Sequence, residues 1–184
     1  QDFICSRKFD SDITEASAVQ WEEEQKELMD HLYNSPSVVK WIVFNENWGQ
    51  YATERLTRWT QNYDPTRIVS NASGWEDHHC GDIFDEHDYG FSPCIALADS
   101  LGDRVSVLGE AGGHNVYLKD HMWDPARIDP PDSDWIRDNG RETYASGVEW
   151  QPRYEAWIQQ LRILREYGMG AAIYTQISDV EPEC

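Results

Sequence analysis

Two glutamates, Glu46 and Glu110, each follow a hydrophobic run that is typical of a buried strand. Glu46 comes after residues 41–45 (WIVFN), and Glu110 follows residues 105–109 (VSVLG). The small residues 111–113 (AGG) after Glu110 leave room for a bulky ligand. Two carboxyl groups at the mouths of separate strands can flank a glycosidic bond, and retaining glycosidases hold such a pair about 5–5.5 Å apart. This pair therefore predicts nucleophilic and acid–base chemistry.

Further polar and aromatic residues cluster where the other expected strands end. In (β/α)8 barrels the catalytic and binding groups lie at the carboxyl ends of the strands, so these residues are candidates for substrate contacts. The candidates are Asn45, Trp48, Trp75, His87, Asp88, Tyr89, Tyr174 and Gln176.

Helices and strands that position these residues alternate along the chain. Helix-forming residues with apolar stripes predict helices over 14–33, 50–63 and 151–167. Short β-branched and aromatic runs predict strands over 38–44, 67–71, 83–87, 105–109 and 170–175. This alternation indicates an α/β fold with adjacent parallel strands, in which residues 112–147 form a long, functional loop.

Composition narrows the class of partner. The 184 residues, 40% of them hydrophobic, suffice for one globular domain over 1–184. The net charge of −19 argues against nucleic acid and membrane surfaces, and no apolar run is long enough for membrane insertion. Nine Trp and nine Tyr suit stacking on sugars as well as core packing. The four cysteines match no metal or redox pattern, so localisation stays open between secreted, periplasmic and cytoplasmic.

An ordered set of motifs resembles glycoside hydrolase family 2. Residues 44–50 (FNENWGQ) look like the Asn-Glu signature at the end of the fourth barrel strand, and residues 108–113 (LGEAGG) are similar to the seventh-strand motif. Residues 34–39, ahead of the first of these motifs, belong to the same fourth-strand signature, and further matching segments appear in order along the chain: 64–67, 73–75, 87–89, 174–176 and 179–181.

The resemblance implies a role for each candidate residue. Glu46 would be the general acid/base and Glu110 the nucleophile of a retaining β-glycosidase. Asn45 would hydrogen-bond the sugar 2-hydroxyl, and Tyr89 would hold the nucleophile. His87 and Asp88 would meet sugar hydroxyls at the rim, while Trp48 or Trp75 would floor the pocket. Tyr174 and Gln176 stand where the family usually carries a Trp. No cofactor or metal is implied.

The resemblance also implies that the sequence covers part of a TIM barrel, strands four to eight with their helices. Strands one to three and any upstream β-sandwich domains would belong to the missing N-terminal part of the same polypeptide, and residues 1–9 would be irregular. Because a (β/α)8 barrel typically needs about 250 residues, we expect the isolated 184-residue chain to be inactive and poorly soluble.

Two other functions fit parts of the sequence. A metal-dependent hydrolase could use His78, His79, Cys80 and Asp82 with His87 and Asp88, although no zinc or calcium motif is present. A non-catalytic carbohydrate-binding protein would need only the aromatic residues. Within the glycosidase hypothesis, β-galactoside, β-glucuronide and β-mannoside cleavage remain open.

Overall fold

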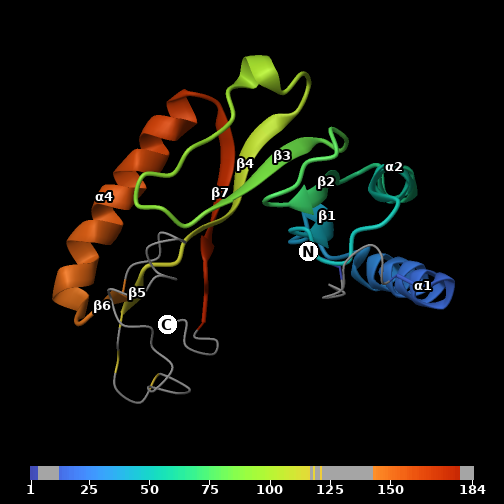
Figure 1. Cartoon of the computed structure of the whole chain (residues 1–184), viewed down its shortest axis with the longest axis horizontal. Coiled ribbons are helices and arrows are strands. Elements are labelled where there is room, and N and C mark those ends of the chain that lie inside the picture. The colour runs from blue at the N-terminus through green and yellow to red at the C-terminus, as the bar shows by residue number, and fades with distance from the viewer. Residues whose placement is uncertain (4–12, 117, 119–120, 122–142, 179–184) are drawn as a thin grey trace. The chain divides into compact units, whose positions relative to one another are not determined.

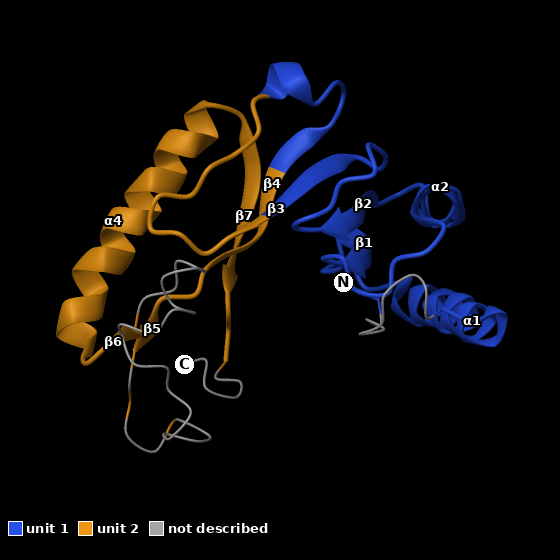
Figure 2. Ribbon diagram, viewed as in Figure 1, with its two compact units in different colours: residues 1–86, 98–106 blue, residues 87–97, 107–184 orange. Residues whose placement is uncertain are grey.

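The computed structural model describes residues 1–3, 13–116, 118, 121 and 143–178 and has an α/β fold (Figure 1). The chain forms two compact units (Figure 2). Unit 1 comprises Gln1–Glu86 and Ala98–Ser106, and unit 2 comprises His87–Leu97 and Val107–Cys184. The division passes through strands β3 (Ile83–Asp88) and β4 (Val105–Gly112).

Helix α1 (Glu15–Leu32) begins and ends close to the predicted limits. Thr14 is its N-cap, and the side chains of Thr14 and Ser17 satisfy one another's backbone N–H groups in a capping box. Trp21 and Met29 lie on its buried side. Neither α1 nor any other helix in the described ranges is long and apolar enough to cross a membrane.

Strands β1 (Lys40–Asn45) and β2 (Ile68–Ser73) pair in parallel, with helix α2 (Thr53–Tyr63) between them. The predicted helix and the parallel pairing of these two strands are thus confirmed. Five of the six β1 residues are buried, as the unbroken hydrophobic run predicts. The core of unit 1 forms around this pair and contains Phe3, Trp21, Met29, Trp41, Val43, Phe44, Leu56, Val69 and Ala72.

The first three residues pair with β1, so the prediction of irregular structure over 1–9 is wrong at its start. The backbone N–H of Phe3 donates to the Ile42 carbonyl, and the Ile42 N–H donates to the Gln1 carbonyl, both at 3.0 Å. Asp2 and Ile42 form a parallel bridge, and the Phe3 ring stacks on Trp41 at 5.8 Å. Residues 4–9 lie outside the described residues. Ring burial and this backbone pairing explain the order at residues 1–3.

The junction between β2 and β3 departs from the predicted row of adjacent strands. The two strands fall in separate sheets, β1-β2 and β3-β4-β7. The Val69 N–H donates to the side chain of Asp82 at 2.7 Å, and the Asp82 N–H donates to the Val69 carbonyl at 2.8 Å. The Asp82 carboxylate therefore replaces a strand partner. Gly81 permits this approach, since a Cβ there would lie 2.7 Å from the Val69 carbonyl oxygen.

A buried carboxylate, Asp64, joins the ends of several elements in unit 1. It accepts hydrogen bonds from the Trp41 indole at 2.9 Å, from Thr66, and from Arg67 at 2.5 Å. Arg67 also donates to the carbonyl groups of Val38, Tyr33 and Ser35. Burial alone would raise the pKa of Asp64, but these hydrogen bonds outweigh it and hold the pKa at about 2.

Unit 2 packs helix α4 (Gly147–Glu166) against strand β7 (Met169–Thr175). Its core contains Leu108, Ala111 and Trp157, with half-buried aromatic and aliphatic side chains around them. The helix begins four residues before the predicted start, because Ser146 caps it and Pro152 is accommodated inside it. A short parallel pair, β5 (Asn115–Val116) with β6 (Thr143–Tyr144), brings together two ends of the predicted long loop.

Candidate active site

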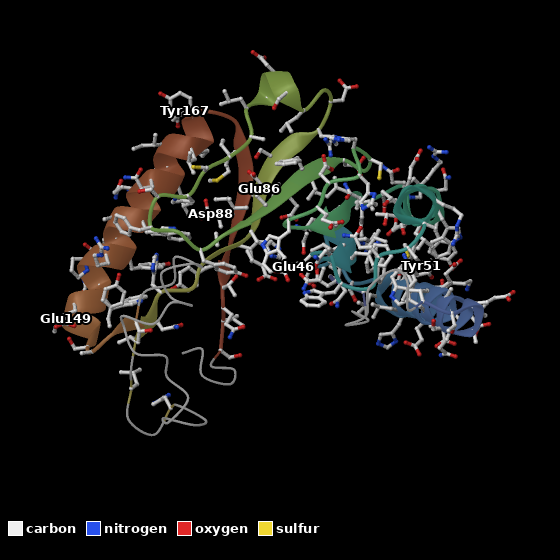
Figure 3. The ribbon with its side chains drawn as sticks, viewed as in Figure 1. Glu46, Tyr51, Glu86, Asp88, Glu149 and Tyr167 are labelled. Atoms are coloured by element: carbon white, nitrogen blue, oxygen red, sulfur yellow. The ribbon has the colours of Figure 1, made fainter. Side chains whose placement is uncertain are left out.

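Glu46 lies just beyond the carboxyl end of β1 in unit 1 (Figure 3), directly after Asn45. Asn45 is the last residue of the strand, and its Oδ1 accepts a hydrogen bond from the Ser73 hydroxyl at 3.1 Å. Ser73 is the last residue of β2 and is paired with Asn45 in the register of the sheet. The parallel pairing thus fixes the Asn45 amide next to the acid/base candidate.

Glu46 leaves the strand in a left-handed backbone conformation, with φ at 54°. Such a conformation costs a non-glycine residue roughly 1–2 kcal/mol, so its neighbours must hold it there. The Glu46 N–H donates to the Ser73 carbonyl at 2.7 Å. The left-handed turn ends the extended path of β1 at the carboxylate.

Two residues of the following turn hold Glu46 further. The indole Nε1 of Trp48 donates to Glu46 Oε2 at 2.9 Å. The Gln50 amide donates to the Glu46 carbonyl, while its own oxygen accepts from the Thr53 hydroxyl at 3.1 Å. Gln50 is only 2% exposed. The sequence motif contains Gln50 but gave it no role; a polar residue four positions after Glu46, directly before a helix, is the signal that could have found it.

Trp75 follows β2 and presents its side chain to solvent, with 60% of its surface exposed. The loop behind it is anchored by Asp77, which forms a two-pronged ion pair with Arg104 at 2.6 and 2.9 Å and accepts from Asn71. Burial raises the pKa of Asp77, but hydrogen bonds from Arg104 and Asn71 lower it overall. The structure therefore presents an exposed aromatic ring on a fixed loop.

Glu110 lies in β4 within unit 2, and its carboxylate is next to His87 of β3 and to Tyr89, which directly follows β3. The Tyr89 hydroxyl donates to Glu110 Oε2, and His87 Nδ1 lies 3.9 Å from the same oxygen. The Glu110 side chain is 31% exposed, whereas the His87 side chain has no exposed surface. The structure thus brings together three predicted site residues, because β3 and β4 are neighbours in one sheet.

The Asp88 carboxylate holds the loop that follows β3. It accepts hydrogen bonds from the backbone N–H groups of Gly90 at 2.8 Å and Cys94 at 2.9 Å. Such bonds from an aspartate to nearby backbone groups are typical of turns. They account for Asp88 without a ligand, and its contact with a sugar stays a prediction.

Tyr174 lies near the end of β7, among the aromatic residues of the unit 2 core. Its ring is 5.5 Å from both Tyr154 and Trp157, and its hydroxyl bonds to the backbone of His114. Burial raises the pKa of Tyr174. These contacts give Tyr174 a packing role. Gln176 follows β7 across a cis peptide bond and is half-buried. Sugar contacts by either residue stay predictions.

The residues of the metal hypothesis serve other contacts. His79 pairs with Asp77 at 3.0 Å, and Asp82 is bound by Gln61 and Val69. Across the described ranges, no three His, Cys, Asp or Glu residues are grouped in a way that could hold a metal ion.

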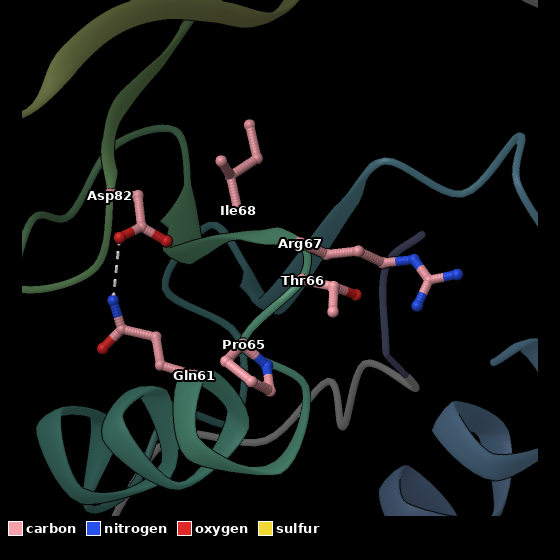
Figure 4. Close-up of a pocket in the computed structure, with 6 residues that line it drawn as sticks. All are labelled: Gln61, Pro65, Thr66, Arg67, Ile68 and Asp82. Atoms are coloured by element: carbon pink, nitrogen blue, oxygen red, sulfur yellow. Dashed lines mark hydrogen bonds between the residues drawn. The ribbon is translucent and has the colours of Figure 1, made fainter.

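A pocket of about 310 Å³ lies at the start of β2 (Figure 4). Ile68 in its lining is the first residue of β2, so the pocket is at the opposite strand end from Ser73 and Glu46. Its charged groups already have partners in Asp64, Val69 and Gln61. We therefore separate it from the candidate active site. It is lined by Gln61, Pro65, Thr66, Arg67, Ile68 and Asp82.

Acidic and polar residues lie at or near the ends of strands in an α/β fold. This arrangement is typical of enzymes whose active sites are built from the loops that follow the strands. The model of the glycosyl hydrolases family 2 TIM barrel domain matches residues 7–100, slightly more than half of the sequence. The chain belongs to this family, which supports glycoside hydrolase activity in general. A search of curated proteins found no match.

Proposed function

We propose that this chain carries the catalytic residues of a retaining β-glycosidase, with Glu110 as nucleophile and Glu46 as general acid/base. The observation that carries the proposal is that Glu46 directly follows β1, Glu110 is among the last three residues of β4, and each carboxylate accepts a hydrogen bond from a neighbouring aromatic side chain. Trp48 donates to Glu46, and Tyr89 donates to Glu110. Fixed donors of this kind hold reactive groups in one orientation.

The reaction takes two displacements. In the first, a Glu110 oxygen bonds to the anomeric carbon, the bond to the leaving oxygen breaks, and Glu46 gives that oxygen a proton. In the second, Glu46 takes a proton from water, the water oxygen bonds to the anomeric carbon, and Glu110 leaves. Two inversions restore the β configuration.

Other residues would bind the sugar around this centre. The Asn45 oxygen is bound by Ser73, which turns the amide N–H₂ group toward a ligand as a donor for the 2-hydroxyl. The exposed Trp75 ring offers an apolar face to a sugar ring. His87 would contribute to the site through its imidazole, which lies beside the Glu110 carboxylate. A terminal sugar of an oligo- or polysaccharide is the substrate class that these groups suit.

The test is a panel of chromogenic β-galactosides, β-glucuronides and β-mannosides applied to the complete polypeptide. Glu110→Gln should abolish turnover, because an amide is too weak a nucleophile. Glu46→Ala should keep slow activity on substrates whose leaving group needs no protonation. Wild-type rates after Glu110→Gln, or a first-formed product of inverted configuration, contradict the mechanism. Sugar binding that survives both changes, without turnover in any preparation, favours a binding protein instead.

We also propose that β1, β2, β3, β4 and β7 correspond, in that order, to strands four to eight of an eight-stranded barrel. Because Ile42 directs both backbone groups to Gln1–Phe3, that segment lies on the edge of β1 opposite to β2. That is the side on which a third strand would pair. On β7, Ile173 is 46% exposed, which suits a face completed by further barrel strands.

In this proposal, the N-terminal part of the same polypeptide closes the barrel and completes the enzyme. Residues 1–184 expressed alone should be poorly soluble and inactive, while the complete polypeptide should be active. A soluble, cooperatively melting monomer of residues 1–184 that hydrolyses an aryl β-glycoside contradicts this part of the proposal.

A further inference from the structure

The turn after β1 holds Glu46 by three different groups. Its N–H donates to Ser73, its carbonyl accepts from Gln50, and its carboxylate accepts from the Trp48 indole. Backbone and side chain are thus restrained separately. Such double restraint at a residue with positive φ indicates that the position of its carboxyl group matters.

The Trp48 side chain donates its one N–H group to this carboxylate. Indole Nε1–H is the only polar group of a tryptophan, and here it meets Glu46 Oε2 at 2.9 Å. Only one residue separates Glu46 from Trp48, and the Trp48 N–H donates to the Asn45 carbonyl at 3.3 Å. The tight turn therefore brings the indole back to the carboxylate.

Gln50 connects the same turn to helix α2. Thr53, the first residue of α2, is 4% exposed and donates to the Gln50 side-chain oxygen. Gln50 in turn donates to the Glu46 carbonyl. A buried chain of hydrogen bonds thus runs from the start of the helix to the backbone of Glu46.

We propose that Trp48 and Gln50 are positioning residues for the acid step, and that Trp48 acts through Glu46 rather than as a platform for the sugar. This inference rests on the proposed role of Glu46 as general acid/base. The indole N–H occupies Oε2 as an acceptor, so the acidic proton resides on Oε1 and is aimed at the leaving oxygen. Gln50 holds the backbone from which the carboxyl group extends.

Trp48→Phe in the complete polypeptide tests the proposal, because it keeps an aromatic ring and removes the donor. The rate constants are compared for a dinitrophenyl β-glycoside, which leaves without a proton, and a methyl β-glycoside, which needs one. We expect kcat/KM, which reports the first displacement, to fall roughly 10- to 100-fold on the methyl glycoside and to change less than about threefold on the dinitrophenyl glycoside. Gln50→Leu should show the same selectivity.

Trp59→Phe is the matched control, since Trp59 lies on α2, stacks on Tyr63 and has no part in the site. It should change neither substrate's rate. The double variant Glu46→Ala/Trp48→Phe separates positioning from folding. If Trp48 acts through Glu46, Trp48→Phe adds no further loss once Glu46 is absent, whereas a folding defect would multiply with it.

Equal losses on both substrates, or a rise in KM as the main effect, identify a sugar platform or a structural role and overturn the inference. Unchanged rates on the methyl glycoside overturn it as well. Different results would contradict the proposed function itself. These are wild-type activity in Glu110→Gln, or equal losses on both leaving groups in Glu46→Ala. If those two variants behave as proposed and Trp48→Phe does not, only the proposed positioning role of Trp48 is contradicted.

Discussion

The Tyr89 hydroxyl donates a hydrogen bond to the Oε2 atom of Glu110, and Tyr89 directly follows β3, the strand next to the β4 strand that carries Glu110. A hydrogen bond to a charged acceptor contributes roughly 1.5–3 kcal/mol, about twice as much as a neutral one. In a nucleophile this bond fixes which oxygen faces the anomeric carbon. The bond therefore bears on rate as well as on local stability.

Tyr89→Phe should lower kcat/KM by about 10- to 100-fold, because the carboxylate loses a donor worth roughly 1.5–3 kcal/mol. The aromatic ring remains, so the melting temperature should change little. Steady-state kinetics on an aryl β-glycoside measure the effect. Tyr167→Phe is the control, since that side chain is 64% exposed at the end of α4. Equal rates for Tyr89→Phe and the wild type would show that the bond does not support the nucleophile.

Asp64 predicts a stability change confined to acid pH. Its pKa in the folded protein is about 2, below its ordinary value of 3.8. The lowered pKa therefore contributes about 2 kcal/mol to the free energy of unfolding. This contribution is fully present above about pH 4 and is lost as the pH falls toward 2.

Asp64→Asn should lower the free energy of unfolding by roughly 2–4 kcal/mol near pH 7, because the amide N–H₂ group would face the donors of Trp41 or Arg67. It should also flatten the decline in stability between pH 4 and 2. Urea unfolding of the complete polypeptide at several pH values measures both effects. Asp99→Asn, at an exposed position in the short helix Ala98–Ser100, is the control. An unchanged pH profile for Asp64→Asn would contradict the assignment.

The helices and strands followed from the sequence because their causes are local. The apolar stripe of α1 and the Thr14 cap determine that helix, and the unbroken run before Glu46 determines β1. The starts of β1 and α2 were misplaced by about two or three residues, since the ends of elements depend on turns. The Asn45–Ser73 contact follows from the parallel pairing of β1 and β2.

Features that depend on side-chain direction were not accessible in this way. The break between β2 and β3 arises because one Asp82 carboxylate oxygen takes a strand position, which no periodicity encodes. Likewise, a tryptophan two positions after a candidate catalytic glutamate suggests a sugar platform from its type alone. Only the turn geometry shows that the Trp48 indole N–H returns to Glu46. Tyr174 was taken as a rim residue, yet its contacts are with the aromatic core of unit 2.

Gly112 provides a test of that core, because it lies two residues after Glu110 and its φ is +85°. A Cβ at this position would lie 2.5 Å from Cε2 and 2.6 Å from Cδ2 of the Tyr174 ring. The ring cannot easily move away, since its hydroxyl bonds to the His114 backbone and its other contacts include Trp157. A methyl group here therefore adds overpacking to backbone strain.

Gly112→Ala should lower the free energy of unfolding by about 2–4 kcal/mol, combining roughly 1–2 kcal/mol for the left-handed backbone with 1–3 kcal/mol for overpacking. Gly168→Ala is a matched control in the same unit, because its φ is +104° and nothing lies within 4 Å of the added methyl group. It should cost only the backbone part. Adding Tyr174→Ala should rescue part of the Gly112→Ala loss, measured as a coupling energy in a double-mutant cycle on the complete polypeptide. Equal destabilisation by the two glycine substitutions, with no coupling to Tyr174, would show that the ring yields and that this core does not constrain the end of β4.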